Sequence, residues 1–173
     1  MDILITPRLT IRPLLEVDAD AIVAHMNDPK VTCNLNPLPK PYRVNDAKAF
    51  LKSVDDDENQ RGYVIARERA IGLILFKNYN TKTKTAHLGY WLASNHHGKG
   101  YMSEALNAML SKFFANGWLE AVDSDIFEGN QASENVQQKL GFEFDGKKPH
   151  QGRVLLTSHL SKEAFYNQQR LAA

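Results

Sequence analysis

The chain has 173 residues, of which 43% are hydrophobic and 24% charged, and its formal net charge is +1. This length predicts a single domain over residues 1–173, and the near-zero charge gives no electrostatic reason to expect nucleic acid or a membrane as partner. The single cysteine, Cys33, excludes an intramolecular disulfide and argues against a cysteine-based zinc site. No signal-peptide pattern and no run of transmembrane length is present, so we expect a cytoplasmic protein.

The first third of the chain predicts a strand followed by two helices. Alternating apolar residues over 9–14 indicate a half-buried strand, and apolar residues at helical spacing over 15–26 indicate a helix that ends before Pro29. Three prolines within 34–43 predict an irregular loop. The second helix is marked by apolar residues between 47 and 54, and it runs into the acidic segment 55–58, which is ordinarily a solvated helix end.

Three strands follow in succession, at 62–67, 71–79 and 85–92. A tight turn joins the first two, so they are expected to form a hairpin. In the third, the even-numbered residues from 86 to 92 face one side of the sheet and the odd-numbered residues face the other.

The most informative segment is the glycine turn that joins this third strand to a helix. It contains Gly98 and Gly100 with one lysine between them, and an apolar stripe from Met102 to Phe113 then marks the helix, which ends near Asn116. Glycines allow a close approach of the backbone, and the helix N-terminus presents unpaired N–H groups with a partial positive charge. Such a turn is a suitable seat for a phosphate or pyrophosphate, although an isolated turn of this kind also occurs with no ligand.

The last third predicts a strand at 121–126 and a helix at 131–140, which Asn130 caps. Segments 142–144 and 153–160 are expected to form a closing hairpin across a loop at 146–152, and a final helix at 161–170 is expected at the periphery. The predicted fold is therefore α/β, with a largely antiparallel first half and a parallel crossover around the glycine turn. The late glycines fit neither a doubly wound dinucleotide fold nor a Walker loop.

Five short motifs, in order on the predicted elements, resemble the GCN5-related N-acetyltransferase (GNAT) family, and within it the ribosomal-protein N-acetyltransferase (RimJ/RimL-type) branch. They are Thr6-Pro7-Arg8-Leu9-Thr10-Ile11-Arg12, Gly89-Tyr90-Trp91-Leu92, Gly98-Lys99-Gly100-Tyr101-Met102, Asn130-Gln131-Ala132-Ser133 and Leu140-Gly141-Phe142. Asn95 stands where the family signature usually has Gln or Arg. The resemblance implies a mixed, mostly antiparallel sheet with a splayed central parallel pair, flanked by helices.

The resemblance also implies that acetyl-coenzyme A (acetyl-CoA) binds across the fold. Its pyrophosphate would lie on the backbone amides of His97, Gly98, Lys99, Gly100, Tyr101 and Met102. Its pantetheine arm would follow Tyr90, Trp91 and Leu92 and meet Asn130 and Ser133. No metal is expected, because the adjacent His96 and His97 point in different directions and have no evident third ligand.

Acetyl transfer in this family proceeds by direct attack of an amine, so Cys33 is not needed as a nucleophile. The resemblance implies that Ser133 lies near the coenzyme sulfur and can donate a proton to the departing thiolate. His87 stands where much of the branch has a glutamate, and an imidazole is a suitable base, but a structural strand residue is an equal alternative. Glu104 is a second candidate base, although the helix dipole already explains a carboxylate in the first turn.

The acceptor stays open among three hypotheses: a protein N-terminus, such as that of a ribosomal protein; a small amine such as a polyamine or aminoglycoside; or no acceptor, in a non-catalytic acyl-CoA-binding module. The acidic segment 55–58 would favour a polycation if it lined the cleft. The resemblance assigns acceptor choice to the segments 34–43 and 147–152. Monomer and homodimer both stay open.

Overall fold

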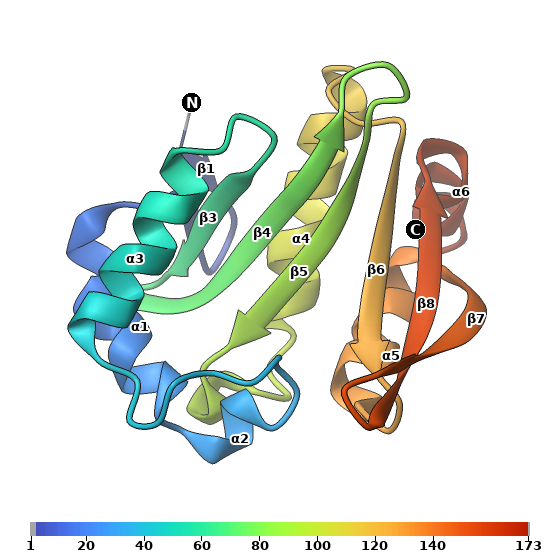
Figure 1. Ribbon diagram of the computed structural model, residues 1–173. Coiled ribbons are helices and arrows are strands. Elements are labelled where there is room, and N and C mark those ends of the chain that lie inside the picture. The colour runs from blue at the N-terminus through green and yellow to red at the C-terminus, as the bar shows by residue number, and fades with distance from the viewer. Residues whose placement is uncertain (1–2, 173) are drawn as a thin grey trace.

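The computed structural model describes residues 3–172, and its centre is one eight-stranded sheet (Figure 1). The strand order is β1-β2-β3-β4-β5-β6-β8-β7, and only the β5–β6 pair is parallel. The strands are β1 (Leu4–Ile5), β2 (Thr10–Pro13), β3 (Arg61–Ala66), β4 (Ala70–Asn80), β5 (Thr85–Leu92), β6 (Ala121–Phe127), β7 (Glu143–His150) and β8 (Arg153–Ser161). The parallel crossover predicted around the glycine turn is confirmed.

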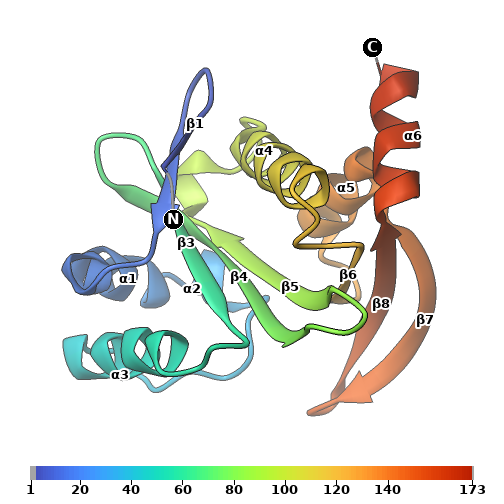
Figure 2. The ribbon, with the colours of Figure 1, turned by 90° about the horizontal axis from the view of Figure 1, so that it is seen from above.

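The helices cover both faces of the sheet. They are α1 (Ala19–Met26), α2 (Pro29–Thr32), α3 (Val44–Asp55), α4 (Tyr101–Ala115), α5 (Gln131–Leu140) and α6 (Lys162–Ala172), with short 3-10 turns η1 (Glu16–Asp18) and η2 (Ser94–His96). Seen from above, α1, α2 and α3 lie on one face, and α4, α5 and α6 lie on the other (Figure 2). The sheet is therefore the middle layer of three.

The main core lies between the sheet and α4. Leu106 and Leu110 of α4 are fully buried, as are Ile74 and Phe76 of β4. The period of the apolar stripe predicted from the sequence therefore matches the buried face of this helix. Because this face is fixed by packing, the N-terminus of α4 is held at a definite position relative to β5.

The parallel pair diverges along its length. Strands β5 and β6 pair over residues 85–88 and 121–124, and beyond Leu88 and Ser124 the pairing stops. Strand β6 continues to pair with β8, while β5 continues to pair with β4. In Figure 1 the two strands are adjacent at the top and well separated at the bottom. The splayed pair implied by the family resemblance is thus confirmed.

Two sequence predictions need correction. The final helix is not peripheral, because Phe165 is fully buried in the main core, and its ring contacts the Phe114 ring of α4 in a tilted arrangement. The closing hairpin has a much shorter loop than expected, since β7 runs to His150 and the turn occupies only 151–152. The polar run at 146–150 hides this strand in the sequence, because most of its residues are exposed.

The remaining differences concern short elements. Strand β1 and the short helix α2 were not predicted, and the expected helix at 15–26 is divided into η1 and α1. Helix α2 begins with Pro29, and the side chain of Asp28 accepts a hydrogen bond from the Lys30 amide, which caps it. Within residues 3–172, no helix is long and apolar enough to cross a bilayer.

Candidate acetyl-transfer site

A cavity of about 510 Å³ occupies the region where β5 and β6 diverge. Its walls come from the end of β5, the glycine turn, the first turns of α4 and α5, and the α2 segment. The sequence-predicted coenzyme residues in this lining are Tyr90, Trp91, Leu92, His97, Gly98, Gly100, Tyr101, Met102, Asn130 and Ser133. Lys99 is the one predicted coenzyme residue outside the lining. We call this space the splay cavity.

The glycine turn has the backbone that its sequence indicates. Gly98 and Gly100 have φ angles of +72° and +76°, which side-chain-bearing residues adopt at a cost. A Cβ atom on Gly98 would meet nothing within 4 Å, so the space beside the turn is open. Gly100 directly precedes α4, whose first amides have no partner within the helix. An anionic group placed here would meet backbone N–H donors and the positive end of a 15-residue helix.

Residues near the start of the chain brace this turn. The Arg8 guanidinium donates to the carboxylate of Glu104 at 2.6 Å and to the Lys99 carbonyl at 2.9 Å, and it lies over the Tyr101 ring. The Thr6 hydroxyl donates to the other oxygen of Glu104 at 2.6 Å. Thr6 and Arg8 belong to the first of the family motifs, but their contact with the glycine turn cannot be deduced from the sequence.

These contacts also define the role of Glu104. Partial burial alone would raise the pKa of Glu104, but the hydrogen bonds from Thr6 and Arg8 outweigh burial and lower it. Both carboxylate oxygens are engaged, and Glu104 lies outside the splay-cavity lining. The structure therefore gives Glu104 a bracing role and offers no support for the alternative of a catalytic base.

Asn130 orients Ser133 at the start of α5. Its side-chain oxygen accepts from the Ser133 amide at 3.3 Å and caps the helix, while its amide nitrogen donates to the Ser133 hydroxyl oxygen at 3.0 Å. Because that contact occupies a lone pair, the Ser133 O–H can donate elsewhere. The Tyr90 hydroxyl donates to the Ser133 carbonyl at 3.4 Å, and burial raises the pKa of Tyr90 to about 12.

A buried polar network joins α5 to the sheet where the strands separate. Gln137 is fully buried, donates to the Ser124 hydroxyl at 2.9 Å and accepts from the Ser158 hydroxyl at 2.8 Å. Ser124 in turn donates to the Leu88 carbonyl at 3.0 Å. The network therefore connects β5, β6, β8 and α5 at the last paired residues. Gln137 follows Ser133 by one helical turn, a spacing that places both residues on one helix face.

His87 lies outside the lining of the splay cavity, on the sheet face opposite α4. Its Nε2 is 3.5 Å from the carboxylate of Asp125, which also accepts from Lys148 at 2.7 Å. Burial lowers the pKa of His87 below its usual value, more than Asp125 raises it. Next to His87 on the same face, a Cβ on Gly89 would meet nothing within 4 Å. Sequence reasoning identified His87 but not its partner Asp125.

A sequence profile described as "Acetyltransferase (GNAT) domain" matches residues 8–143. The chain belongs to the GNAT acetyltransferase family. Its members transfer an acetyl group from acetyl-CoA, so this chain is a GNAT N-acetyltransferase.

Individual relatives agree with this assignment. An uncharacterized N-acetyltransferase, p20, from Bacillus licheniformis is 29% identical over 152 residues, which cover 84% of this chain and 85% of p20. The ribosomal-protein-serine acetyltransferase of Escherichia coli K12 is 32% identical over 93 residues, about half of each chain (51% and 52%). A crystal structure of RimL, a ribosomal L7/L12 alpha-N-protein acetyltransferase in complex with coenzyme A, superposes with a TM-score of 0.84. It is 19% identical, over 94% of this chain and 99% of RimL, and supports the GNAT fold.

The splay cavity of this GNAT chain fits the anionic coenzyme. The open glycine turn and the free amides of α4 suit the pyrophosphate, and Lys139 of α5 adds a cation to the lining. Among the described residues, no Asp or Glu side chain lies in the lining of this cavity. No group of three His, Cys, Asp or Glu residues that could hold a metal occurs in the described part of the chain.

The acidic segment 55–58 lies elsewhere. It borders a separate cavity of about 890 Å³ between α3 and β3, which shares no lining residue with the splay cavity. The segment would favour a polycationic acceptor only if it lined the cleft of the site. Since it does not line the splay cavity, it gives no support for such an acceptor. Its carboxylates are at the far end of α3, away from the splay cavity.

Proposed function

We propose that this GNAT enzyme acetylates the N-terminal α-amine of a protein, as the RimJ/RimL-type branch does. The observation that carries the proposal is the absence of carboxylates from the splay-cavity lining, together with the remote position of segment 55–58. A polyamine needs negative groups to bind its several charges, whereas a peptide N-terminus presents one amine. The E. coli relative, named a ribosomal-protein-serine acetyltransferase, supports the same choice. The enzyme would encounter such a protein N-terminus in the cytoplasm.

In this mechanism Ser133 assists the leaving group. The bound thioester supplies the acetyl group, and the amine attacks its carbonyl directly. Asn130 holds the Ser133 oxygen by donating to it, so the Ser133 hydroxyl can donate its proton toward the departing sulfur. The gain is expected to be modest, because a thiolate with a pKa near 8.5 is already a good leaving group.

We assign the base to His87. An alkylammonium must lose its proton before it attacks, and His87 is neutral at pH 7 because burial lowers its pKa. The open face at Gly89 lies between His87 and the strand end that borders the cavity. His87 would accept the proton through solvent in this space, since it lies outside the cavity lining. Asp125 positions the imidazole and stabilises its charged form.

A thiol-release assay with acetyl-CoA tests the proposal. We expect peptides with free N-termini to have a kcat/KM at least about tenfold above that of spermidine or an aminoglycoside. Mass spectrometry should place the acetyl group on the α-amine. A preference for spermidine or the aminoglycoside would contradict the proposal. Coenzyme binding by calorimetry without thiol release from any amine would also contradict it, and would indicate a binding module.

A further inference from the structure

A third cavity, of about 330 Å³, adjoins the splay cavity on the side of α2. It lies between residues 32–40 and the tip of the β7–β8 hairpin, and Leu35 lines both cavities. We call it the hairpin pocket. Its walls are mostly apolar, and include Met26, Leu38 and Phe127. It is the right size for one or two side chains.

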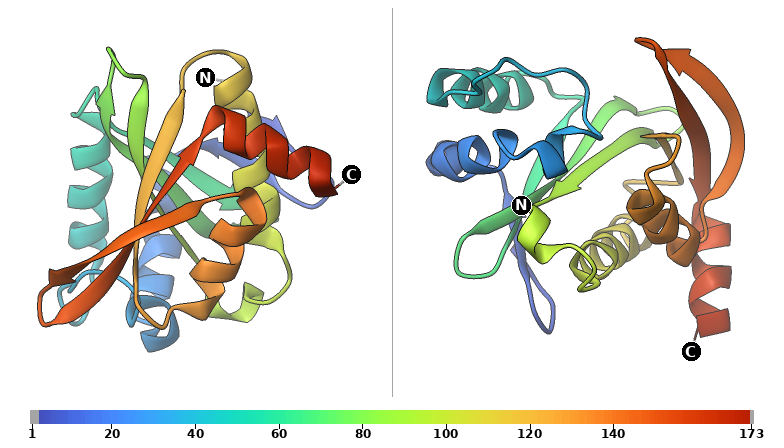
Figure 3. Two further views of the ribbon diagram at one scale, coloured as in Figure 1. Left: turned by 90° about the vertical axis from the view of Figure 1, so that its right-hand side faces the viewer. Right: turned by 90° about the horizontal axis from the view of Figure 1, so that it is seen from below.

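Side chains from the hairpin close the outer wall of this pocket. Arg153 donates to the Cys33 carbonyl at 2.7 Å, and its guanidinium lies 3.5 Å from the centre of the Phe127 ring. His150 contacts the Asn36 side chain at 3.0 Å. The left panel of Figure 3 shows the hairpin tip reaching the α2 region. Two segments more than 100 residues apart in the chain thus enclose one space.

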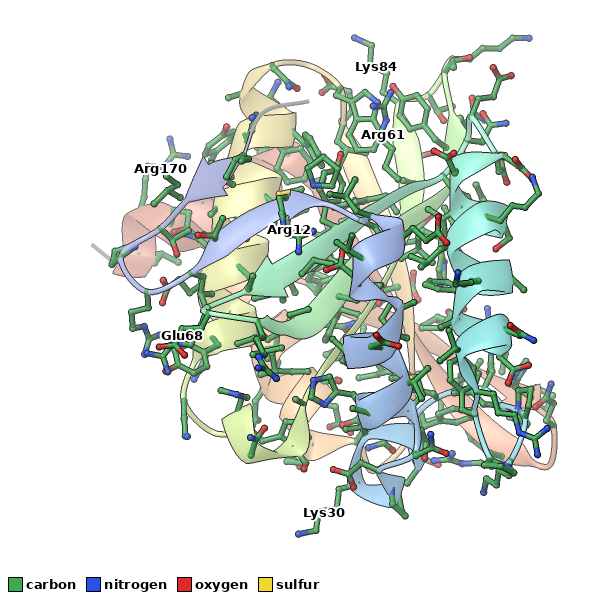
Figure 4. The ribbon with its side chains drawn as sticks, turned by 90° about the vertical axis from the view of Figure 1, so that its left-hand side faces the viewer. Arg12, Lys30, Arg61, Glu68, Lys84 and Arg170 are labelled. Carbon is green, nitrogen blue, oxygen red and sulfur yellow. The ribbon has the colours of Figure 1, made fainter. Side chains whose placement is uncertain are left out.

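The charged groups of the hairpin pocket are cations. Lys40 and Arg153 lie in its lining, and no Asp or Glu between residues 3 and 172 does. Lys30, in the lining of the splay cavity, extends outward from α2 at the lower edge of Figure 4. Of the nearby carboxylates, Glu128 is paired with Lys147, whereas Asp28 accepts from the neutral Ser94 hydroxyl and keeps its charge. The cations Lys30, Lys40 and Arg153 outnumber this one unpaired carboxylate. The entrance on this side is therefore apolar inside and positively charged at its border.

We propose that the hairpin pocket receives the first side chain of an acceptor polypeptide and selects an apolar residue that is followed by acidic residues. This inference rests on the proposed function and names the class of N-terminus that the enzyme takes. The amine would enter the splay cavity past Leu35, and the next residues would leave past Lys40 and Arg153. Acidic residues of the acceptor would be attracted by Lys40 and Arg153, whereas lysines of the acceptor would be repelled.

The expected selectivity follows from two general magnitudes. Burial of a leucine side chain in an apolar pocket favours it over glycine by at least about tenfold. One exposed ion pair contributes about a twofold to fivefold preference for an acidic residue of the acceptor over a basic one. With two acidic residues at the border, the two preferences multiply. Salt weakens the preference that comes from ion pairing but not the preference that comes from apolar burial.

The test compares four peptides on the full chain, identical except at their first three residues: Leu-Asp-Asp, Leu-Lys-Lys, Gly-Asp-Asp and Gly-Lys-Lys. Spermidine is included as a further acceptor. We expect Leu-Asp-Asp to have the highest kcat/KM, with a roughly fivefold or greater preference over Leu-Lys-Lys that shrinks in 0.5 M salt. Equal acetylation of all four peptides would overturn the pocket assignment and leave the proposed function intact. Acetylation of spermidine in preference to every peptide would overturn both.

Charge-reversal variants locate the effect. Lys40→Glu should reduce the preference for Leu-Asp-Asp over Leu-Lys-Lys by about fivefold or more, and Arg153→Glu should act in the same direction. Lys84→Glu is the matched control, because Lys84 lines neither cavity and lies at the opposite end of the molecule from Lys30 (Figure 4). If Lys40→Glu and Lys84→Glu behave alike, the cationic border does not select the acceptor. The coenzyme Kd, measured by calorimetry, should stay unchanged in all three variants.

Discussion

Burial and a neighbouring carboxylate act on His87 in opposite directions, and burial prevails. The neutral imidazole is favoured, so the pKa lies below 6.5 and His87 is a competent base at neutral pH. Protonation removes the base, so activity supported by His87 is lost as pH falls through this lowered pKa. The same side chain without Asp125 would have a still lower pKa, because the one strong contribution that raises it would be gone.

The pH profile therefore tests His87 directly. Wild-type kcat/KM should have an acidic limb with a midpoint below pH 6.5. His87→Ala should remove this limb and lower kcat by about 10²-fold or more, and Asp125→Asn should move the limb to lower pH. His159→Ala is the control, since His159 also pairs with an aspartate, Asp123 at 2.7 Å, but is more exposed. An unchanged profile in His87→Ala would exclude it as the base.

At Gly98 the backbone conformation disfavours a side chain, and a coenzyme bound at the turn would also exclude one. Gly98→Val should raise the KM for acetyl-CoA by about tenfold or more and change the KM for the amine little, because the new side chain occupies the open space beside the turn. Gly117→Val is the control: Gly117 has the same φ of +72° at the far end of α4. Both variants should lose about 1–2 kcal/mol of stability from backbone strain. Equal KM changes for both substrates would contradict the assignment of the turn to the coenzyme.

Among the elements, α5 and α6 show how helices attach to the diverging half of the sheet. Helix α5 is held by the hydrogen bonds of Gln137 and carries Ser133 one turn earlier. Helix α6 inserts Phe165 into the main core, although most of its surface is polar. One helix is therefore positioned by a polar network and the other by an aromatic anchor.

Phe165→Ala should destabilise the protein by about 3–5 kcal/mol, because a fully buried aromatic ring is replaced by a cavity. Leu171→Ala on the same helix should change stability by less than about 0.5 kcal/mol, since Leu171 is 84% exposed. Urea unfolding midpoints measure both. A loss below about 1 kcal/mol for Phe165→Ala would mean that α6 is as peripheral as its sequence indicated.

The elements also show what could be predicted from the sequence. The glycine turn and the stripe of α4 were predictable because both follow from local rules, positive φ at glycine and a 3.6-residue period. The burial of Phe165 was not, because it depends on packing against Phe114, 51 residues earlier in the chain. The same is true of Arg8 and Glu104, whose pairing joins residues 96 positions apart. The extent of β7 was missed because an exposed edge strand carries little apolar periodicity.

For the whole molecule, the divergence of β5 and β6 leaves part of the sheet without a strand partner. Residues 89–92 pair with β4 on one side, and in the described part of the chain no strand pairs with them on the other. A ligand that fills the splay cavity should therefore order the strand edge and the glycine turn together.

Hydrogen exchange can follow this ordering. Saturating acetyl-CoA should slow exchange at amides in 89–92 and 97–102 by about tenfold or more. Amides in 55–58, beside the separate acidic cavity, should exchange unchanged and provide the internal control. Protection centred on 55–58 instead would place the coenzyme in the acidic cavity and contradict the assignment of the splay cavity to the coenzyme.

The brace between Arg8 and the glycine turn has a consequence for how the enzyme becomes active. Because Thr6 and Arg8 contact Glu104 and Lys99 across more than 90 residues, the glycine turn is fully braced only after the start of the chain has docked against its middle. Long-range contacts of this kind form slowly, since closing a large loop costs entropy before any contact repays it. Coenzyme affinity should thus appear late in refolding, after most helical signal has returned. Binding of a fluorescent coenzyme A analogue would then time the final docking step of the chain.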